Sequence, residues 1–210
     1  MTTNPWLGVP LSDYETHMRS AAVGQLEPLA ALFSEVLALR QPASVAILGV
    51  AGGNGLERID SAVTTRVVGV DIQPEYLDAV RMRFPDLPGL ELMQADLSVD
   101  TLTAPPVRLV HAALVFEHAG TTKCLENAIG LVAEGGSLSV VLQLPSELDH
   151  AVGSSQVTTV SRFADHFKFV EPEQFSRMVS SRGFRRTHSR TLPVPSGKSF
   201  WLGVFDSVTG

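Results

Sequence analysis

Three points of the sequence carry residues that could hold a nucleotide. The segment Ala46–Glu57 reads AILGVAGGNGLE, so that a glycine cluster follows a short apolar run. Asp71 and Asp96 each close a later apolar run, and Asp71 comes twenty positions after Ala51. Glycines allow a tight turn and close approach of a ligand to the backbone, and an acid can accept hydrogen bonds from ribose hydroxyls. A structural turn and two helix-capping acids would explain each piece alone, but their combination favours nucleotide binding.

A second group of polar side chains could move a proton. Glu117 and His118 follow the apolar run Val107–Val115, whose end should meet the glycine turn at one edge of a parallel sheet. Either side chain could act as a general base toward an oxygen or nitrogen nucleophile. A polar pair that caps the loop is the alternative interpretation, and the sequence does not separate the two.

Alternating strand and helix signals must position these residues. Apolar runs predict strands at 45–50, 65–72, 89–96, 107–115 and 137–144, followed by two strand-like runs at 184–192 and 199–208. Helical patterns lie at 12–20, 25–40, 73–84, 121–134 and 172–181. Ser12 should cap the first helix, and a further helix should open near Asn54, run past Ile59 and present its N-terminus to the ligand.

This order of elements predicts one α/β domain over residues 1–210. We expect a Rossmann-like, mostly parallel seven-stranded sheet with helices on both faces. The last two strands are joined by a connection containing proline and glycine, which is typical of a C-terminal antiparallel hairpin. Residues 1–43 form a helical segment that precedes the first strand.

The pattern of glycines and acids narrows the choice of nucleotide. The dinucleotide fingerprint G-x-G-x-x-G is absent, because Gly53 and Gly55 fit its start but Arg58 stands where the last glycine belongs. The phosphate-binding pattern G-x-x-x-x-G-K-[ST] is absent as well. The glycine turn followed by Asp71 and Asp96 instead resembles the class I S-adenosylmethionine-dependent methyltransferases.

The resemblance implies S-adenosylmethionine as the cofactor and assigns roles to individual residues. Asp71 would bind the ribose, Asp96 would lie near the adenine amino group, and Leu97 would pack on the adenine ring. The glycine turn would approach the methionine part. The cofactor-contacting residues implied in this way are Gly49, Ala51, Gly53, Gly55, Asp71, Ile72, Asp96 and Leu97.

Two departures from the family pattern affect this expectation. Ala51 stands at a position where the family usually has a glycine. Gly49 stands at a position where the family usually has an acid that anchors the cofactor's amino group. Glu57 could replace that acid, or it could be a carboxylate favoured by the helix dipole. A non-catalytic module that binds S-adenosylmethionine or a nucleoside is therefore an alternative. An aminopropyltransferase on the same scaffold is a third interpretation.

The substrate side is less well marked. Tyr14 and His17 lie three positions apart, on one face of the first predicted helix, and could contact substrate. Segments before the first strand cover the cleft in many methyltransferases, so that this helix could be a lid with a hinge at 23–25. An ordinary surface helix is the alternative. Aromatic and histidine residues in the long segment 145–170 could line a pocket or pack in the core: Phe163, His166, Phe167 and Phe169.

Composition restricts the class of partner. The formal net charge is −6 and the pI about 5.5, which argues against nucleic acid as the main partner. No N-P-P-Y-type tetrad follows the fourth predicted strand, which argues against methylation of adenine N6 or of glutamine. We expect a small-molecule acceptor. The N-terminus lacks signal-peptide features and no apolar run could span a bilayer, so that we expect a cytoplasmic protein without a membrane partner. No metal-ligand spacing occurs, and the oligomeric state stays open.

Overall fold

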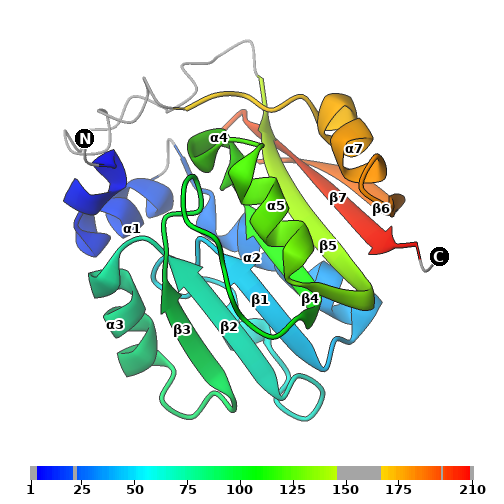
Figure 1. Ribbon diagram of the computed structural model, residues 1–210. Helices are drawn as coiled ribbons and strands as arrows, with labels where there is room; N and C mark the ends of the chain where they lie inside the picture. The colour runs from blue at the N-terminus through cyan, green and yellow to red at the C-terminus, as the bar shows by residue number, and fades with distance from the viewer. Residues whose placement is uncertain (1–3, 21–22, 146–166, 195, 209–210) are drawn as a thin grey trace.

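The computed structural model describes residues 4–20, 23–145, 167–194 and 196–208. Its strands are β1 (Ser44–Leu48), β2 (Arg66–Asp71), β3 (Leu90–Gln94), β4 (Val107–Ala113), β5 (Val132–Leu144), β6 (Phe184–Pro193) and β7 (Ser199–Ser207). They form one seven-stranded sheet in the order β3-β2-β1-β4-β5-β7-β6 (Figure 1). Strands β1 to β5 pair in parallel, and β7 pairs antiparallel with β5 and β6. The predicted Rossmann-like sheet with a C-terminal antiparallel hairpin is confirmed.

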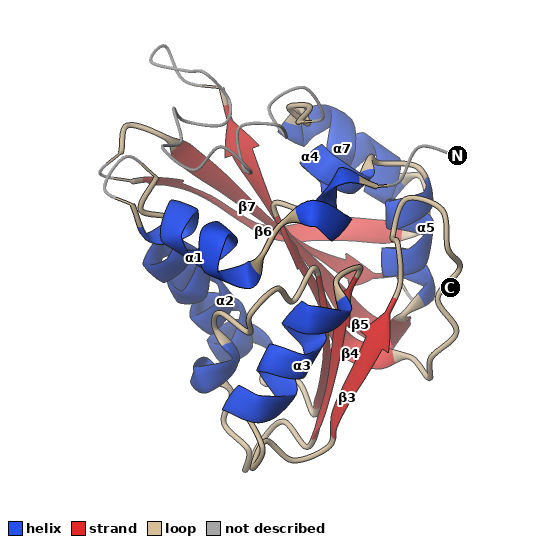
Figure 2. Cartoon of the chain, turned by 90° about the vertical axis from the view of Figure 1, so that its left-hand side faces the viewer, coloured by secondary structure: helices blue, strands red, loops and turns tan. Residues whose placement is uncertain are grey.

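Helices cover both faces of this sheet. They are α1 (Leu11–Arg19), α2 (Leu26–Arg40), α3 (Pro74–Arg83), α4 (Phe116–Ala119), α5 (Lys123–Gly130) and α7 (Pro172–Ser180), with short 3₁₀ helices η1 (Pro5–Gly8) and η2 (Leu56–Arg58). Figure 2 shows α1, α2 and α3 on one side of the sheet and α5 and α7 on the other. Strands β1 and β2 are buried at every residue but the first, as expected for parallel strands covered on both faces.

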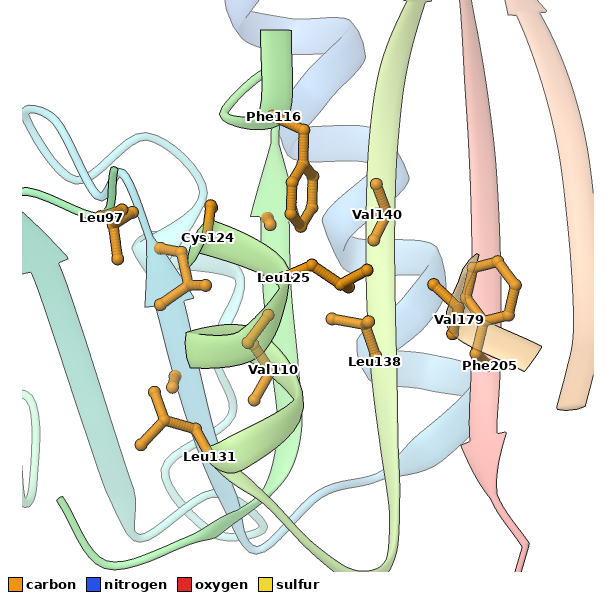
Figure 3. Close-up of a cluster of buried hydrophobic side chains, with 14 of the residues drawn as sticks. Leu97, Val110, Phe116, Cys124, Leu125, Leu131, Leu138, Val140, Val179 and Phe205 are labelled. Atoms are coloured by element: carbon orange, nitrogen blue, oxygen red, sulfur yellow. The ribbon is translucent and has the colours of Figure 1, made fainter. Parts of the chain in front are cut away.

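Two apolar clusters hold the layers together. On the α5 side, Leu125 and Cys124 pack against Val110, Leu138 and Phe116 (Figure 3). The other cluster joins α2 and α3 to the opposite face of the strands. Because both faces of β1 and β4 are covered, only the ends of these strands are open to a ligand.

The helix predicted to open near Asn54 is wrong. Turns follow β1, and only the 3₁₀ helix Leu56–Arg58 forms before the chain becomes extended at Ile59. Gly53 and Gly55 have φ angles of 88° and 91°, which interrupt a right-handed helix. No α-helix N-terminus in the described residues follows this turn directly.

Two other boundaries differ from the prediction. Helix α1 begins at Leu11, and its N-cap position is occupied by Pro10, which makes no side-chain capping hydrogen bond. Ser12 lies inside the helix, so the cap predicted at Ser12 is wrong. The helix predicted over 121–134 ends at Gly130, because Val132 already pairs with β4. Residues Phe163 and His166 lie outside the described residues.

Candidate functional site

A cavity opens at the carboxyl ends of the parallel strands. The centres of water molecules can occupy about 180 Å³ of this cavity, which is enough room for several water molecules. The residues that line it and that the sequence singled out are Tyr14, His17, Gly49, Ala51, Asp71, Ile72, Asp96, Leu97, His118 and Phe167. Gly53, Gly55 and Glu117 do not line it. Residues from β1, β2, β3 and β4 therefore meet at one opening.

Asp71 is the most buried carboxylate of the cavity wall. Its side chain is 7% exposed, and its two oxygens accept hydrogen bonds from Ala51 N at 2.8 Å and Gln73 N at 3.0 Å. Burial raises the pKa of Asp71 above its ordinary value, while these backbone N–H groups act in the opposite direction. The carboxylate is held rigidly, and each oxygen retains a lone pair for a further donor.

Asp96 lies at the next strand end, with one oxygen fixed by its own loop. Its Oδ1 accepts hydrogen bonds from the backbone and the hydroxyl of Ser98, and Asn4 Nδ2 donates to Oδ2 at 2.8 Å. Partial burial opposes ionisation, but the donors from Ser98 and Asn4 outweigh it and hold the pKa of Asp96 below its ordinary value. Leu97, which follows, is 6% exposed and adds an apolar wall.

The glycine turn divides into residues that face the cavity and residues that do not. Gly49 and Ala51 line it, with φ angles of 69° and 47°. A Cβ at Gly53 would lie 2.5 Å from the Phe84 ring, and one at Gly55 would lie 3.1 Å from Phe33. Gly53 and Gly55 thus permit packing of the turn against the fold, and the direct approach to a ligand falls to Gly49 and Ala51.

Glu57 does not supply the acid that Gly49 lacks. Its Oε2 accepts a hydrogen bond from Gly55 N at 3.0 Å, its other oxygen pairs with Arg58, and its side chain is 52% exposed. It is absent from the cavity lining, where Asp71 and Asp96 are the only carboxylates among the described residues. Glu57 therefore forms local contacts at the short 3₁₀ helix η2, and the α-helix whose dipole would have favoured it does not form.

The N-terminal segment 4–19 forms one wall of the cavity. Gln73 Nε2 donates to the carbonyl oxygens of Trp6 and Val9, and the Tyr76 hydroxyl donates to Val9 at 3.0 Å. On α1, Glu15 pairs with Arg83 of α3, and the Arg83 guanidinium also donates a hydrogen bond to Gly52 O at 2.9 Å. These contacts tie the segment to α3 and to the glycine turn. The lid function and the hinge at 23–25 stay predictions.

Glu117 and His118 point to different environments. His118 lines the cavity, with its ring edge-on to Trp6 at a centroid distance of 4.9 Å and to Phe167 at 5.3 Å. Glu117 is 1% exposed, and its Oε1 accepts a hydrogen bond from Gln143 N at 2.8 Å. Burial raises the pKa of Glu117 to about 7. Only His118 is placed to meet a ligand directly, so the position of Glu117 does not support the catalytic role predicted for it.

Several lining residues were missed from the sequence. Asn4, Trp6, Gln25, Gln143 and Lys198 all contribute to the cavity. Gln143 carried a signal, because it interrupts the apolar run at the end of β5, Val140–Leu144. Lys198 precedes β7, whose first residue pairs with Leu144 at the end of β5. Only the antiparallel return of the chain brings that lysine to the carboxyl edge.

Metal and membrane features are absent from the part of the chain that the structure describes. No group of three histidine, cysteine or acidic side chains there could hold a metal ion. None of its helices has the length and apolar character needed to cross a membrane. Burial raises the pKa of Cys124 to about 12, which fits a structural thiol.

Solved structures share this architecture. No protein-family model and no curated protein matches the sequence. The N-methyltransferase NodS from Bradyrhizobium japonicum WM9, in complex with S-adenosyl-L-homocysteine, aligns with a TM-score of 0.61 at 17% identity over 98% of this chain and 93% of that one. The fold is that of the class I methyltransferases. A putative methyltransferase from Bacillus halodurans C-125 aligns at 0.65 and 14% identity over 86% of this chain and 99% of that one.

The methyltransferase fold is not confined to methyl transfer. The cyclase SpnF aligns with a TM-score of 0.66 at 9% identity over 85% of this chain and 80% of that one. At such identities the likeness concerns the fold alone. Function therefore has to be argued from the residues of the cavity.

Proposed function

We propose that this chain binds S-adenosylmethionine in the cavity and transfers its methyl group to a small-molecule acceptor. The observation that carries the proposal is that one cavity joins two acids at the ends of β2 and β3 to His118 beyond β4. Cofactor-facing and acceptor-facing groups thus share one space. Open α/β sheets bind ligands at this edge, which supports the same conclusion.

The residues present fit the nucleoside part of such a cofactor. Asp71 and Asp96 offer carboxylate oxygens for ribose hydroxyls and for an exocyclic amino group, and Leu97 offers an apolar surface. Gly49 lines the cavity, and a Cβ there would lie 2.7 Å from Val115 Cγ2, so a larger residue would clash with Val115. When bound, the cofactor supplies an electrophilic methyl group on a sulfonium leaving group. Asp71 and Asp96 would hold it, with Gly49 and Ala51 beneath.

The remaining walls would act on the acceptor. His118 would accept the proton that an oxygen or nitrogen nucleophile loses as its bond to the methyl carbon forms. The rings of Trp6 and Phe167 flank His118 and would exclude water from it. Glu117 would serve as a positioning residue, because its carboxylate ties α4 to the end of β5. Tyr14 and His17 would contact substrate from the N-terminal segment.

A non-catalytic binding module remains the second candidate. The observation that favours it is that glycine stands at position 49 and that, among the described residues, the cavity lining has no carboxylate other than Asp71 and Asp96. Without that anchor, the amino group of the cofactor would depend on backbone carbonyls. Such a module would bind S-adenosylmethionine and its product but would not consume the methyl group.

Calorimetry and a transfer assay distinguish these functions. Titration with S-adenosylmethionine and S-adenosylhomocysteine should show one saturable site with either ligand. Incubation with methyl-labelled S-adenosylmethionine and a fractionated metabolite extract should then place the label on a small molecule. Binding without label transfer would support the module, and absence of binding would refute both functions.

A further inference from the structure

Ala51 has a backbone conformation that a residue with a side chain disfavours. Its φ angle is 47°, and it holds the second position of a turn that Gly53 N closes by donating to Val50 O at 2.9 Å. Glycine, asparagine and aspartate dominate this position when its φ is positive, and other residues disfavour a left-handed backbone roughly fivefold or more. Because Ala51 also lines the cavity, the contacts that hold this turn bear on ligand binding.

Two hydrogen bonds from outside the turn hold Ala51 in place. Ala51 N donates to Asp71 Oδ2 at 2.8 Å, and the Arg83 guanidinium donates to Gly52 O at 2.9 Å. The first bond fixes the peptide group before Ala51, and the second fixes the peptide group after Gly52. A change of φ at Ala51 rotates these two groups relative to each other, so the two bonds together oppose it. The turn and the carboxylate of Asp71 are thus held as one unit.

Arg83 is itself fixed by the N-terminal helix. It ends α3, and its guanidinium donates to both carboxylate oxygens of Glu15 on α1. The Glu15 side chain is 13% exposed; burial opposes its ionisation, but Arg83 and Arg19 outweigh this effect and hold the pKa of Glu15 below its ordinary value. A Cβ at Gly52 would overlap both the Glu15 carboxylate and the Arg83 guanidinium. Glycine at position 52 therefore leaves room for this ion pair against the turn.

An ordinary surface ion pair is the alternative interpretation. Exposed pairs contribute little to stability, and the Arg83 side chain is 42% exposed. Two features distinguish this pair: its carboxylate is mostly buried, and its guanidinium also bonds the backbone carbonyl that follows Ala51. Arg81, which lies on the same helix and pairs with exposed Asp78, offers a matched comparison.

We propose that Arg83, held by Glu15, is a positioning residue that keeps Ala51 in its left-handed conformation and so keeps the turn and Asp71 in place for the cofactor. The pair would do for this chain what a glycine at position 51 would do through its conformational freedom. Neither Glu15 nor Arg83 is among the residues that line the cavity, so both would act on a ligand through the turn. The effect on cofactor affinity rests on the proposed function, whereas the conformation of the turn does not depend on it.

A double-mutant cycle on the whole chain tests this inference. S-adenosylhomocysteine would be titrated by calorimetry into the wild type, Arg83→Met, Ala51→Gly and the double variant. Arg83→Met should raise the Kd about fivefold or more in the wild-type chain, because an alanine released from the clamp leaves the binding conformation. In the Ala51→Gly chain the same substitution should raise the Kd less than about twofold, since glycine adopts a positive φ without strain. Arg81→Met is the control and should bind as tightly as the wild type.

Hydrogen exchange of the residue-51 amide reports on the turn without any ligand. This amide bonds Asp71 in the wild type, so NMR should show it protected from exchange. Arg83→Met should lower the protection of this amide in the cofactor-free protein. Most of the protection should return in the double variant, although that variant still lacks the ion pair. A pair that only stabilised the fold would not produce this recovery.

Each outcome decides the inference. An equal rise of Kd in both chains, equal protection of the amide in Arg83→Met and the wild type, or an equal loss in Arg81→Met would overturn it. If Arg83→Met does not fold, Glu15→Gln takes its place in the cycle, because it keeps the size of the side chain and removes the charge that holds the guanidinium. If S-adenosylhomocysteine does not bind to the wild type, the proposed function fails, and the exchange measurement still decides whether Arg83 holds the turn.

Discussion

The side-chain amide of Asn4 donates a hydrogen bond of 2.8 Å to Asp96 Oδ2, which joins the N-terminal segment to the loop after β3. Ser98 saturates the other oxygen of the carboxylate with two hydrogen bonds. Oδ2 therefore has one lone pair left for a ligand. Asn4 both orients Asp96 and closes the cavity over it.

Removal of the Asn4 amide should change how Asp96 titrates. The folded-state pKa of Asp96 is lowered, so this group stabilises the fold above the ordinary carboxyl pKa and loses that contribution as pH falls through the folded value. In Asn4→Ala one donor is lost, and the pKa of Asp96 should rise. Carboxyl-detected NMR titration measures this directly. Asn54→Ala removes an exposed amide that bonds Leu26 O and should leave Asp96 unchanged; an identical titration in both variants would refute the link.

Asp71→Asn should weaken cofactor binding without unfolding the protein. The substitution keeps the shape and one acceptor oxygen for the Ala51 or Gln73 N–H, but it removes the negative charge. Charge-assisted hydrogen bonds contribute about 1.5–3 kcal/mol, so the affinity for S-adenosylmethionine should fall roughly tenfold or more. Calorimetry measures the affinity, and thermal unfolding checks the fold. Asp78→Asn, at an exposed position of α3, is the control; equal affinities in the two variants would exclude a ribose-binding role.

An acid introduced at Gly49, where the family pattern has one, should lower the stability of the fold and should not improve cofactor binding. A side chain there would adopt a φ of 69° and place its Cβ 2.7 Å from Val115 Cγ2. The left-handed backbone alone costs about 1–2 kcal/mol, and the clash adds to it. Chemical denaturation should therefore show Gly49→Asp to be less stable than Gly183→Asp, since Gly183 has a φ of 83° but nothing within 4 Å of a Cβ. Tighter cofactor binding by a stable Gly49→Asp variant would contradict this account.

Glu117 should make the fold less stable as pH rises through neutrality. Its pKa is raised from 4.5 to about 7 by burial, so the folded state holds a proton that the unfolded chain releases. The free energy of unfolding should fall by up to about 3 kcal/mol between pH 4.5 and 7 and level off above. Glu117→Gln, which can still accept from Gln143 N, should abolish this fall. Denaturation at several pH values tests it, with exposed Glu134→Gln as control; a wild-type slope in Glu117→Gln would refute it.

His118 should contribute to turnover more than to cofactor affinity. It lies past β4, whereas the two acids lie at β2 and β3. With an identified acceptor, His118→Asn should lower kcat by about a hundredfold, while the Kd for S-adenosylmethionine changes little. His188→Asn removes a histidine of β6 that bonds Glu35 on α2, and this variant should keep full activity. Loss of cofactor binding in His118→Asn would place the loop on the cofactor side.

The sequence by itself determined the order of the strands and most of the residues that line the cavity at the ends of β1, β2 and β3. Parallel strands buried on both faces need continuous apolar runs, and β1 and β2 show such runs. Asp71 and Asp96 follow apolar runs directly, and parallel pairing brings strand ends to one edge without any further information. Local sequence also placed the hairpin, because its turn chemistry lies within a few residues.

Tertiary structure alone decided which polar groups share the cavity. Glu117 and His118 are neighbours in sequence, yet a short helix turns one into the core and the other to the cavity. Lys198 joins His17 only because β7 returns antiparallel to β5, and Asn4 meets Asp96 only because η1 and α1 are held by α3. The helix expected after the glycine turn failed because positive φ angles at Gly53 and Gly55 depend on packing against Phe84 and Phe33. Contacts between residues so distant in sequence leave no periodic signal in the chain.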